Sequence, residues 1–209
     1  MTNLLHDGPE EGPILLLAHG AGAPMDSEFM DAFAVGLANA GLRVVRFEFP
    51  YMAARRHGMR RPPDREAALL QTWRDVLVAF DTGSVFIGGK SMGGRMASMV
   101  ADEMGVCGVV CLGYPFHAPG RPAAPRIAHL AVLHTPALIV QGSRDPFGSR
   151  AEVAGYELSP AVQVHWLEDG DHDFKPRAAS GRTQRQNWDE GIAAVAAFVW
   201  EQVTSLGGR

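Results

Sequence analysis

The sequence predicts an α/β fold, in which a mostly parallel sheet of about six strands carries helices on both faces. Two observations support this prediction. Short apolar runs, typical of strands, alternate with longer segments of helical period along the chain. Several runs are apolar at nearly every position, as expected for strands that helices cover on both sides. The regular alternation favours parallel strands joined by right-handed crossovers.

The strands are predicted from runs rich in Val, Ile, Leu and Phe that end at glycine, proline or charged residues. In chain order these runs are Ile14–Ala18, Leu42–Phe49, Val85–Gly88, Val106–Leu112, Ala137–Gln141 and Val162–Leu167. Only about a dozen residues precede the first run, so no earlier strand is predicted.

The helices are predicted where apolar residues recur every three or four positions. In chain order they are Ser27–Ala40, Arg65–Phe80, Met92–Met104, Phe147–Leu158 and Asn187–Val203. The second follows the breaker Pro62-Pro63, and the last begins at Asn187, which is an N-cap candidate.

Three irregular stretches begin where a predicted strand has just ended. They are Pro50–Pro63, Pro115–Pro125 and Gly170–Thr183. In parallel sheets covered by helices, ligands bind at the carboxyl ends of the strands. We therefore expect these stretches to surround any active site.

Composition and charge limit the class of protein. The chain has 209 residues, of which 46% are hydrophobic and 20% charged, and it is predicted to fold as a single domain, 1–209. Its net charge of −4 argues against nucleic-acid binding, which requires a basic face. No apolar run near the start could span a membrane, and the first residues are acidic where a signal peptide is basic. We expect a cytoplasmic protein without a nucleic-acid or membrane partner.

One motif points to nucleophilic catalysis. Residues 89–93 read Gly-Lys-Ser-Met-Gly and match G-x-S-x-G. The match alone is weak in a chain with 24 glycines, but it stands between a predicted strand and a predicted helix. That setting is typical of a nucleophile elbow, a sharp turn that exposes a serine hydroxyl at the start of a helix. Ser91 is therefore predicted to be a nucleophile rather than part of an ordinary turn.

A serine nucleophile needs a base, and the base needs an acid to orient it. In this fold the three follow in the order serine, acid, histidine. Asp145 follows one later strand and His172 the next, so we interpret them as acid and base. His117 is the main alternative base, although it precedes Asp145. The other acids near His172 are weaker candidates because they are too close to it in sequence; these are Asp169, Asp171 and Asp173.

The turn after the first strand reads HGAGAPMD and can direct backbone N–H groups at a substrate carbonyl. Ala21 or Gly22 is predicted to supply one oxyanion donor and Met92, at the start of a helix, the other. His19 is predicted to hold this turn through ring hydrogen bonds rather than to act as a base. The alternative is a plain connection between strand and helix.

The order HG-x-G, G-x-S-x-G, Asp and His resembles the α/β-hydrolase superfamily over nearly the whole chain. The stretches HGAGAPMD, FEFPYM followed by PPDR, and GKSMGGRMAS resemble a bacterial branch of small, cap-less serine hydrolases with distant eukaryotic relatives in chromatin complexes. The resemblance implies a Ser91–His172–Asp145 triad, with the backbone of Ala21 and Met92 at the oxyanion hole. Larger members open with two extra antiparallel strands, which are not predicted here. No long insertion separates Leu112 from Ala137, so we expect no lid domain.

The expected substrate pocket is shallow and built by loops. Its candidate residues follow strand ends near Ser91: Tyr114, Phe116, His117 and Phe147, with Phe174 as a further candidate. Aromatic residues at strand ends also serve as core residues, and that alternative stays open. The loop Arg55–Arg65 carries five arginines that could bind an anionic substrate, but a solvated loop is the favoured interpretation.

We interpret the chain as a serine hydrolase of the carboxylesterase or thioesterase kind, which cleaves a small-molecule ester or thioester through an acyl-enzyme. It is expected to need no cofactor and no metal, because no histidine or cysteine cluster has the spacing of a metal site. The alternative is a non-catalytic hydrolase-fold protein that serves as a binding or scaffold protein.

Overall fold

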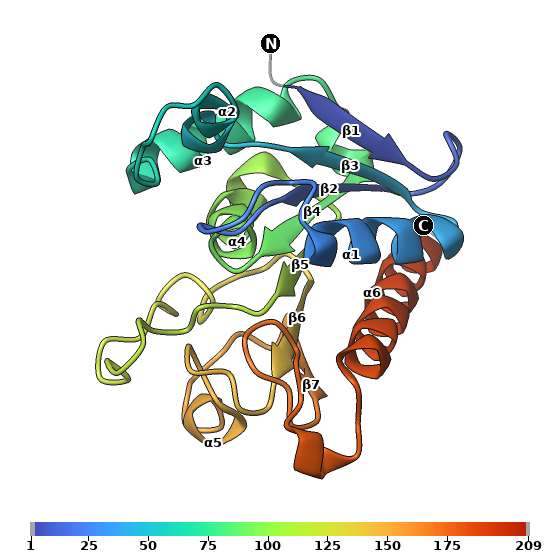
Figure 1. Cartoon of the computed structure of the whole chain (residues 1–209). Coiled ribbons are helices and arrows are strands. Elements are labelled where there is room, and N and C mark those ends of the chain that lie inside the picture. The colour runs from blue at the N-terminus through green and yellow to red at the C-terminus, as the bar shows by residue number, and fades with distance from the viewer. Residues whose placement is uncertain (1–2, 208–209) are drawn as a thin grey trace.

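The computed structural model describes residues 3–207, which form one seven-stranded sheet in the order β1-β3-β2-β4-β5-β6-β7 (Figure 1). The strands are β1 Leu4–Asp7, β2 Ile14–Ala18, β3 Arg43–Phe47, β4 Val85–Lys90, β5 Gly108–Leu112, β6 Ala137–Gly142 and β7 Val162–Leu167. Strands β2 to β7 run parallel, and β1 pairs antiparallel with β3. The mostly parallel α/β class is therefore confirmed.

Strand β1 was not predicted from the sequence. It has only four residues, and two of them are polar, so it lacks the apolar run that marks the other strands. It is held by a contact distant in sequence. Arg46 on β3 is buried and donates a hydrogen bond of 2.9 Å to Asp7 of β1. A buried arginine needs such a partner, and β1 supplies it.

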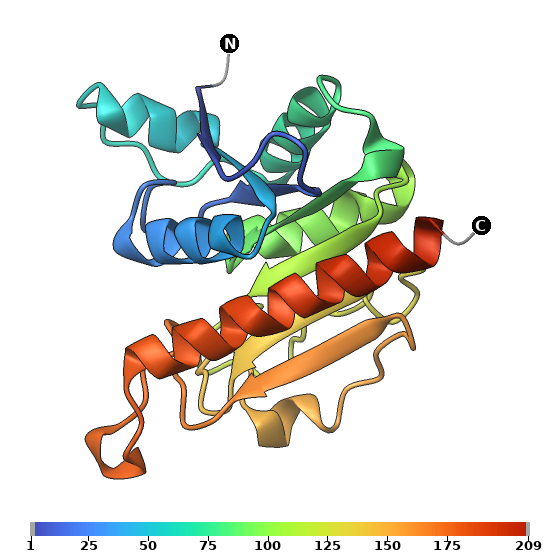
Figure 2. The same cartoon turned by 90° about the vertical axis from the view of Figure 1, so that its right-hand side faces the viewer.

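The helices cover both faces of the sheet. They are α1 Glu28–Asn39, α2 Pro50–Arg56, α3 Glu66–Leu77, α4 Met92–Met104, α5 Arg150–Val153 and α6 Gln184–Gly207, with short 3-10 turns at η1 Thr82–Ser84 and η2 Ala178–Ser180. Helices α3 and α4 lie on one face and α1 and α6 on the other, as Figure 1 shows. In Figure 2, α6 runs across the sheet in front of the strands.

Three helices differ most from the prediction, whereas α1 and α3 are only shorter than predicted, by one to three residues at an end. Helix α2 forms inside the stretch predicted to be irregular, because Pro50 at its first position is compatible with a helix start. Helix α5 has four residues rather than the predicted twelve; Ser149 and Glu152 form a capping box at its start. Helix α6 begins at Gln184, so Asn187 is not its N-cap. Its buried side chain instead donates to the carbonyl oxygen of Phe174, at 2.8 Å.

Two apolar cores lie on the two faces of the sheet, because successive side chains of a strand point to opposite sides. Leu16 of β2 belongs to the core under α3 and α4, whereas its neighbours Leu15 and Leu17 belong to the core under α1 and α6.

Residues 113–136, between β5 and β6, form neither helix nor strand. Among residues 3–207, no helix combines the length and apolar character needed to cross a membrane.

Candidate active site

Ser91 occupies the sharp turn between β4 and α4, and its backbone has a positive φ of 50°. Such a conformation is rare for a residue with a side chain. The turn is held by a 2.9 Å hydrogen bond from the Ser91 N–H to the carbonyl oxygen of Leu112. Glycine is required on both sides: a Cβ would lie 2.1 Å from the Ala18 oxygen at Gly89 and 2.5 Å from it at Gly93.

The structure brings Ser91, His172 and Asp145 into one chain of hydrogen bonds. The Nε2 atom of His172 lies 2.9 Å from the Ser91 hydroxyl, and its Nδ1 atom lies 2.7 Å from Oδ2 of Asp145. The three residues follow β4, β7 and β6, whose carboxyl ends meet at one edge of the sheet. Ser91 and His172 are 81 positions apart in sequence.

Asp145 is fully buried, and its two oxygens have further donors. The Phe147 N–H donates to Oδ1 at 2.8 Å, and the Gln141 amide donates to Oδ2 at 3.0 Å. A carboxylate accepts, so Nδ1 of His172 is its donor, and Nε2 is left to accept the proton of Ser91. Gln141 was not among the predicted site residues. Its signal was a polar residue at the end of an otherwise apolar strand.

The loop that carries His172 is fixed at several points. The Asp171 carboxylate accepts hydrogen bonds of 2.9 Å from the N–H groups of Asp173 and Lys175. The indole of Trp188 on α6 donates to the carbonyl oxygen of Asp173, at 3.1 Å. Lys90 donates from its ammonium group to the carbonyl oxygen of His172. Lys90 was also missed; its signal was a lysine at the end of a buried strand.

His19 holds the turn after β2 through hydrogen bonds of its ring, as predicted. Nδ1 of His19 donates to the carbonyl oxygen of Gly20 at 2.6 Å, and its Nε2 accepts from the Phe49 N–H at 3.1 Å. Burial lowers the pKa of His19, which fits these roles of a neutral ring. The Tyr51 hydroxyl donates to the carbonyl oxygen of Ala21 at 3.0 Å. These contacts fix the backbone of the turn beside Ser91.

A cavity of about 320 Å³ opens beside Ser91 and His172. Ala21 and Gly22 line one part of it. Met92 is the first residue of α4, a position whose N–H has no acceptor within the helix. The ring of Phe147 lies 4.3 Å from the His172 ring, centre to centre. The other apolar lining includes Ala23, Phe29 and Met30.

The other predicted pocket residues lie elsewhere. Tyr114 and Phe116 are fully buried and pack edge to face in the core under α3 and α4, rather than in the cavity. His117 is also buried; its Nδ1 donates to the carbonyl oxygen of Ala118 at 2.9 Å, and its Nε2 lies 3.5 Å from Glu152. Phe174 packs under α1 and α6. Apolar burial draws these rings into the core, whereas Phe147 contacts the cavity.

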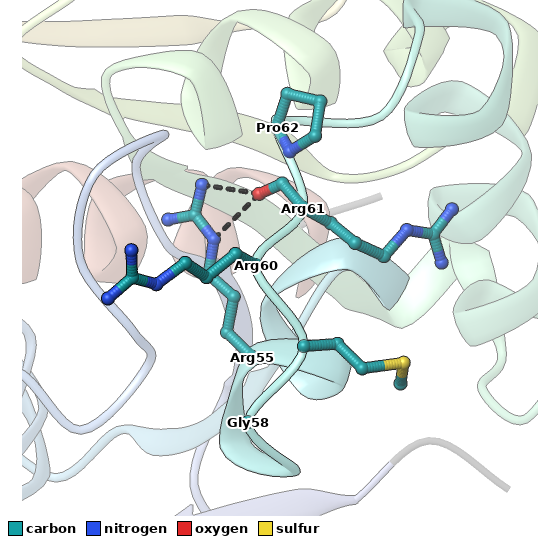
Figure 3. Close-up of a pocket in the computed structure, with 6 residues that line it drawn as sticks. Arg55, Gly58, Arg60, Arg61 and Pro62 are labelled. Atoms are coloured by element: carbon teal, nitrogen blue, oxygen red, sulfur yellow. Dashed lines mark hydrogen bonds between the residues drawn. The ribbon is translucent and has the colours of Figure 1, made fainter.

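The arginine loop forms a second cavity, of about 630 Å³, lined by Arg55, Arg60 and Arg61. Figure 3 shows the Arg55 guanidinium directed at the carbonyl oxygen of Arg61, with hydrogen bonds of 2.9 and 2.7 Å. Arg56 binds the carboxylates of Glu48 and Asp26. Arg61 lies 3.8 Å from the carboxylate of Asp64. Three of the five arginines are thus engaged within the chain, which favours the solvated-loop interpretation. In the described part of the chain, no group of three His, Cys, Asp or Glu side chains could hold a metal ion.

The sheet order and the serine on a strand–turn–helix define the class of α/β hydrolases. A family model described as an alpha/beta hydrolase domain matches residues 11–200, so the chain belongs to this family. The resemblance to the superfamily is thereby confirmed. The narrower resemblance, to the branch with chromatin-associated relatives, is not tested and stays a prediction.

Solved structures show the same fold. Est1E of Butyrivibrio proteoclasticus, with bound ferulic acid, superposes with a TM-score of 0.72 at 15% identity, over 97% of this chain and 96% of that one. A serine hydrolase without a lid, XC6422 of Xanthomonas campestris, gives 0.62 at 18% identity, over 92% and 88%. A serine hydrolase homologue of Coxiella burnetii gives 0.65 at 16% identity, over 94% and 88%. At these identities the likeness is one of fold.

Proposed function

We propose that the protein is a serine hydrolase that cleaves small-molecule esters or thioesters. The observation that carries this proposal is the unbroken chain of hydrogen bonds from Ser91 through His172 to the buried Asp145. A serine hydroxyl is a weak nucleophile unless a base removes its proton, and here the base and its orienting acid both lie within hydrogen-bond distance.

The reaction proceeds in two halves. Ser91 Oγ attacks the carbonyl carbon while its proton passes to Nε2 of His172. The N–H groups of Met92 and of Ala21 or Gly22 bind the oxyanion, and each such donor contributes roughly 3 kcal/mol to the transition state. The intermediate then expels the alcohol or thiol, which takes the proton from His172. Water attacks the acyl-enzyme in the same way, releasing the acid and restoring Ser91.

The cavity supports a small acyl substrate. At about 320 Å³ it lies at the lower end of the range for ligand pockets, and much of its lining is apolar. Two of the structural relatives are described as serine hydrolases, which is consistent with ester cleavage. Esters and thioesters are also more reactive than amides, and suit a site without a lid.

A fluorophosphonate probe tests the proposal, because it phosphonylates only an activated serine. We expect wild-type protein to form one adduct, on Ser91, and to hydrolyse p-nitrophenyl acetate. Both activities should be lost in Ser91→Ala. Turnover should be kept in His117→Ala, because the His117 ring contacts Ala118 and Glu152 instead of Ser91. Intact-protein mass spectrometry reads the adduct, and absorbance reads the turnover.

The chain offers a matched control in Ser98. This serine also lies on α4, with its hydroxyl 2.9 Å from Nε2 of His129, but it is buried. Ser98→Ala should label as fast as wild type. Folded wild-type protein without an adduct on Ser91 would support the non-catalytic alternative, a binding or scaffold protein. Equal labelling of Ser91→Ala would also refute the proposal.

A further inference from the structure

Lys90 is the last residue of β4, directly before Ser91. Its side chain is only 10% exposed and lines the same cavity as Ser91 and His172. Burying an ammonium group costs free energy unless other groups bind it. The only other lysine of the chain, Lys175, is exposed. The contacts of Lys90 therefore have to offset a cost that Lys175 does not have.

These contacts converge on the loop that carries the base. The Lys90 ammonium donates to the carbonyl oxygen of His172 and lies 3.2 Å from a carboxylate oxygen of Asp173. It also lies 5.0 Å from the ring centre of Phe29 and 5.6 Å from that of Phe174, within the range of cation–π attraction. Oxygens and ring faces together satisfy the buried charge.

The aliphatic part of the same side chain packs elsewhere. A Cβ at Gly20 would lie 3.3 Å from Cγ of Lys90, so the lysine stem lies against the turn after β2. One side chain thus contacts the oxyanion turn with its stem and the base loop with its ammonium group, and it is bonded to the residue that carries the nucleophile. Burial lowers the pKa of Lys90, while the carboxylates of Asp173 and Asp145 oppose that shift.

We propose that Lys90 is a positioning residue for the reaction: its ammonium group, by binding the carbonyl oxygen of His172, holds the imidazole within hydrogen-bond distance of Ser91. This inference rests on the proposed hydrolase function. A methionine of similar length would fill the same space without holding the loop. Replacing a buried ionic group with a well-packed apolar one is often neutral or stabilising. Lysine at position 90 therefore serves the placement of the base rather than the stability of the fold.

Lys90→Met is the decisive variant. We expect its urea unfolding midpoint to equal or exceed that of wild type, while fluorophosphonate labelling of Ser91 slows by roughly 10- to 100-fold, the loss that small misplacements of catalytic groups produce. Lys90→Arg, which keeps the charge and the donors, should recover part of the rate. Lys175→Met is the matched control and should label as wild type does.

A double-mutant cycle separates positioning from a general structural role. If Lys90 acts through His172, Lys90→Met should have no further effect in a His172→Ala background. The readout is the residual hydrolysis of p-nitrophenyl acetate, which should stay within about two-fold of the His172→Ala value. A lysine that merely supports the cavity would lower this residual rate as well.

Several outcomes would overturn the inference. One is a folded Lys90→Met protein that labels within about two-fold of wild type. Another is a loss that adds to that of His172→Ala. If Lys90→Met does not fold, Lys90→Leu decides, since it also removes the ammonium group that binds the carbonyl oxygen of His172; unchanged labelling then refutes the inference. Wild-type protein that fails to label refutes the proposed function itself, whereas wild-type labelling with an unaffected Lys90→Met refutes only the role of Lys90.

Discussion

Ser91 has a backbone conformation that costs free energy, of order 1–3 kcal/mol for a residue with a side chain at such a φ. The surrounding backbone has to hold it there. Gly93, the second residue of α4, lets the helix start against the end of β2, where the carbonyl oxygens of Ala18 and His19 lie. The geometry of the serine therefore depends on a glycine that takes no part in the chemistry.

Gly93→Ala tests this dependence. The added Cβ would lie 2.5 Å from the Ala18 oxygen and 2.7 Å from the His19 oxygen, both backbone atoms that cannot rotate away. We expect a loss of about 1–3 kcal/mol in the free energy of unfolding, as for overpacked sites. Because α4 or the turn after β2 has to shift, labelling of Ser91 should also slow. Urea denaturation and labelling kinetics measure the two effects.

Gly83→Ala is the matched control for that substitution. The nearest atom to its added Cβ is a carboxylate oxygen of Asp81, at an ordinary 3.7 Å. Stability should change by less than about 0.5 kcal/mol, and labelling should not change. A Gly93→Ala protein as stable and as reactive as wild type would show that the contact between α4 and β2 does not fix Ser91.

At the residue scale, the three residues of the candidate triad were predicted from the sequence, but the residues that hold them in place were not. Chain order alone indicated that Ser91, Asp145 and His172 lie at one edge of the sheet, because their strands are parallel. Gln141 and Lys90 were missed because nothing in a sequence tells which polar groups meet after folding. A polar residue inside an apolar strand signals such a contact but leaves its partner unnamed.

At the scale of elements, Ser98 of α4 forms a second serine–histidine pair, with His129 of the loop before β6. This pair is structural. The Ser98 hydroxyl and the Tyr114 hydroxyl lie 2.9 and 3.4 Å from Nε2 of His129. Ser98 and Tyr114 are fully buried, and His129 is partly so. Burial, followed by the positive charge of Arg95, lowers the pKa of His129 to about 4. The pair thus ties α4 to the loop before β6 through a neutral ring.

This pKa predicts a dependence of stability on acid. The pKa of an unfolded histidine is about 6.5, so between about pH 6.5 and 4 the unfolded state binds more protons than the folded state. The contribution of His129 is complete above about pH 6.5 and is lost as the pH falls toward about 4. Allowing for solvent screening, we expect a loss of about 1–3 kcal/mol. Urea denaturation at pH 7 and at pH 4.5 should show a smaller difference for His129→Gln than for wild type.

His57→Gln provides the comparison, since His57 lies on an exposed turn. Its pH dependence should match that of wild type. Titration of the many carboxylates contributes equally to all three proteins and cancels in the comparison. An acid sensitivity of His129→Gln as large as that of wild type would refute the assigned role of His129.

Elements were predictable where local signals sufficed. Helix α4 has the predicted bounds, because its apolar period ends at Gly105, which caps it in the left-handed conformation. Strand β1 and helix α2 were missed because each is short and is stabilised by contacts distant in sequence. The carboxylate of Asp64 accepts the Tyr51 N–H in the first turn of α2, at 2.9 Å, and Arg46 holds β1. Short elements that are stabilised by contacts distant in sequence cannot be predicted from the local sequence pattern.

At the scale of the whole molecule, the small cavity and the absence of helices in residues 113–136 limit the acyl chain. Each buried methylene contributes about 0.8 kcal/mol, or up to roughly a four-fold gain in kcat/KM. We expect this gain along a series of p-nitrophenyl esters for about the first four carbons, and a plateau or decline thereafter, because longer chains extend into water. Initial rates from acetate to dodecanoate measure it.

Met30→Ala tests whether the cavity sets the preferred chain length, because Met30 is buried and lines the cavity. Shortening it should move the preferred chain length upward while leaving Ser91 reactive toward the fluorophosphonate probe. A wild-type preference for dodecanoate would contradict this account, and would place the acyl chain on a surface outside the cavity.

Strand β4 lies at the centre of the sheet and β7 at one edge. The contact between Ser91, which follows β4, and His172, which follows β7, therefore joins the central strand to an edge strand. Side chains of β7 are mostly half-buried, and edge strands open at lower free energy than central ones. A transient opening of β7 would separate base from nucleophile while the rest of the sheet stays intact. For the proposed hydrolase, we therefore expect labelling of Ser91 to fall on heating at a lower temperature than the one at which the whole protein unfolds.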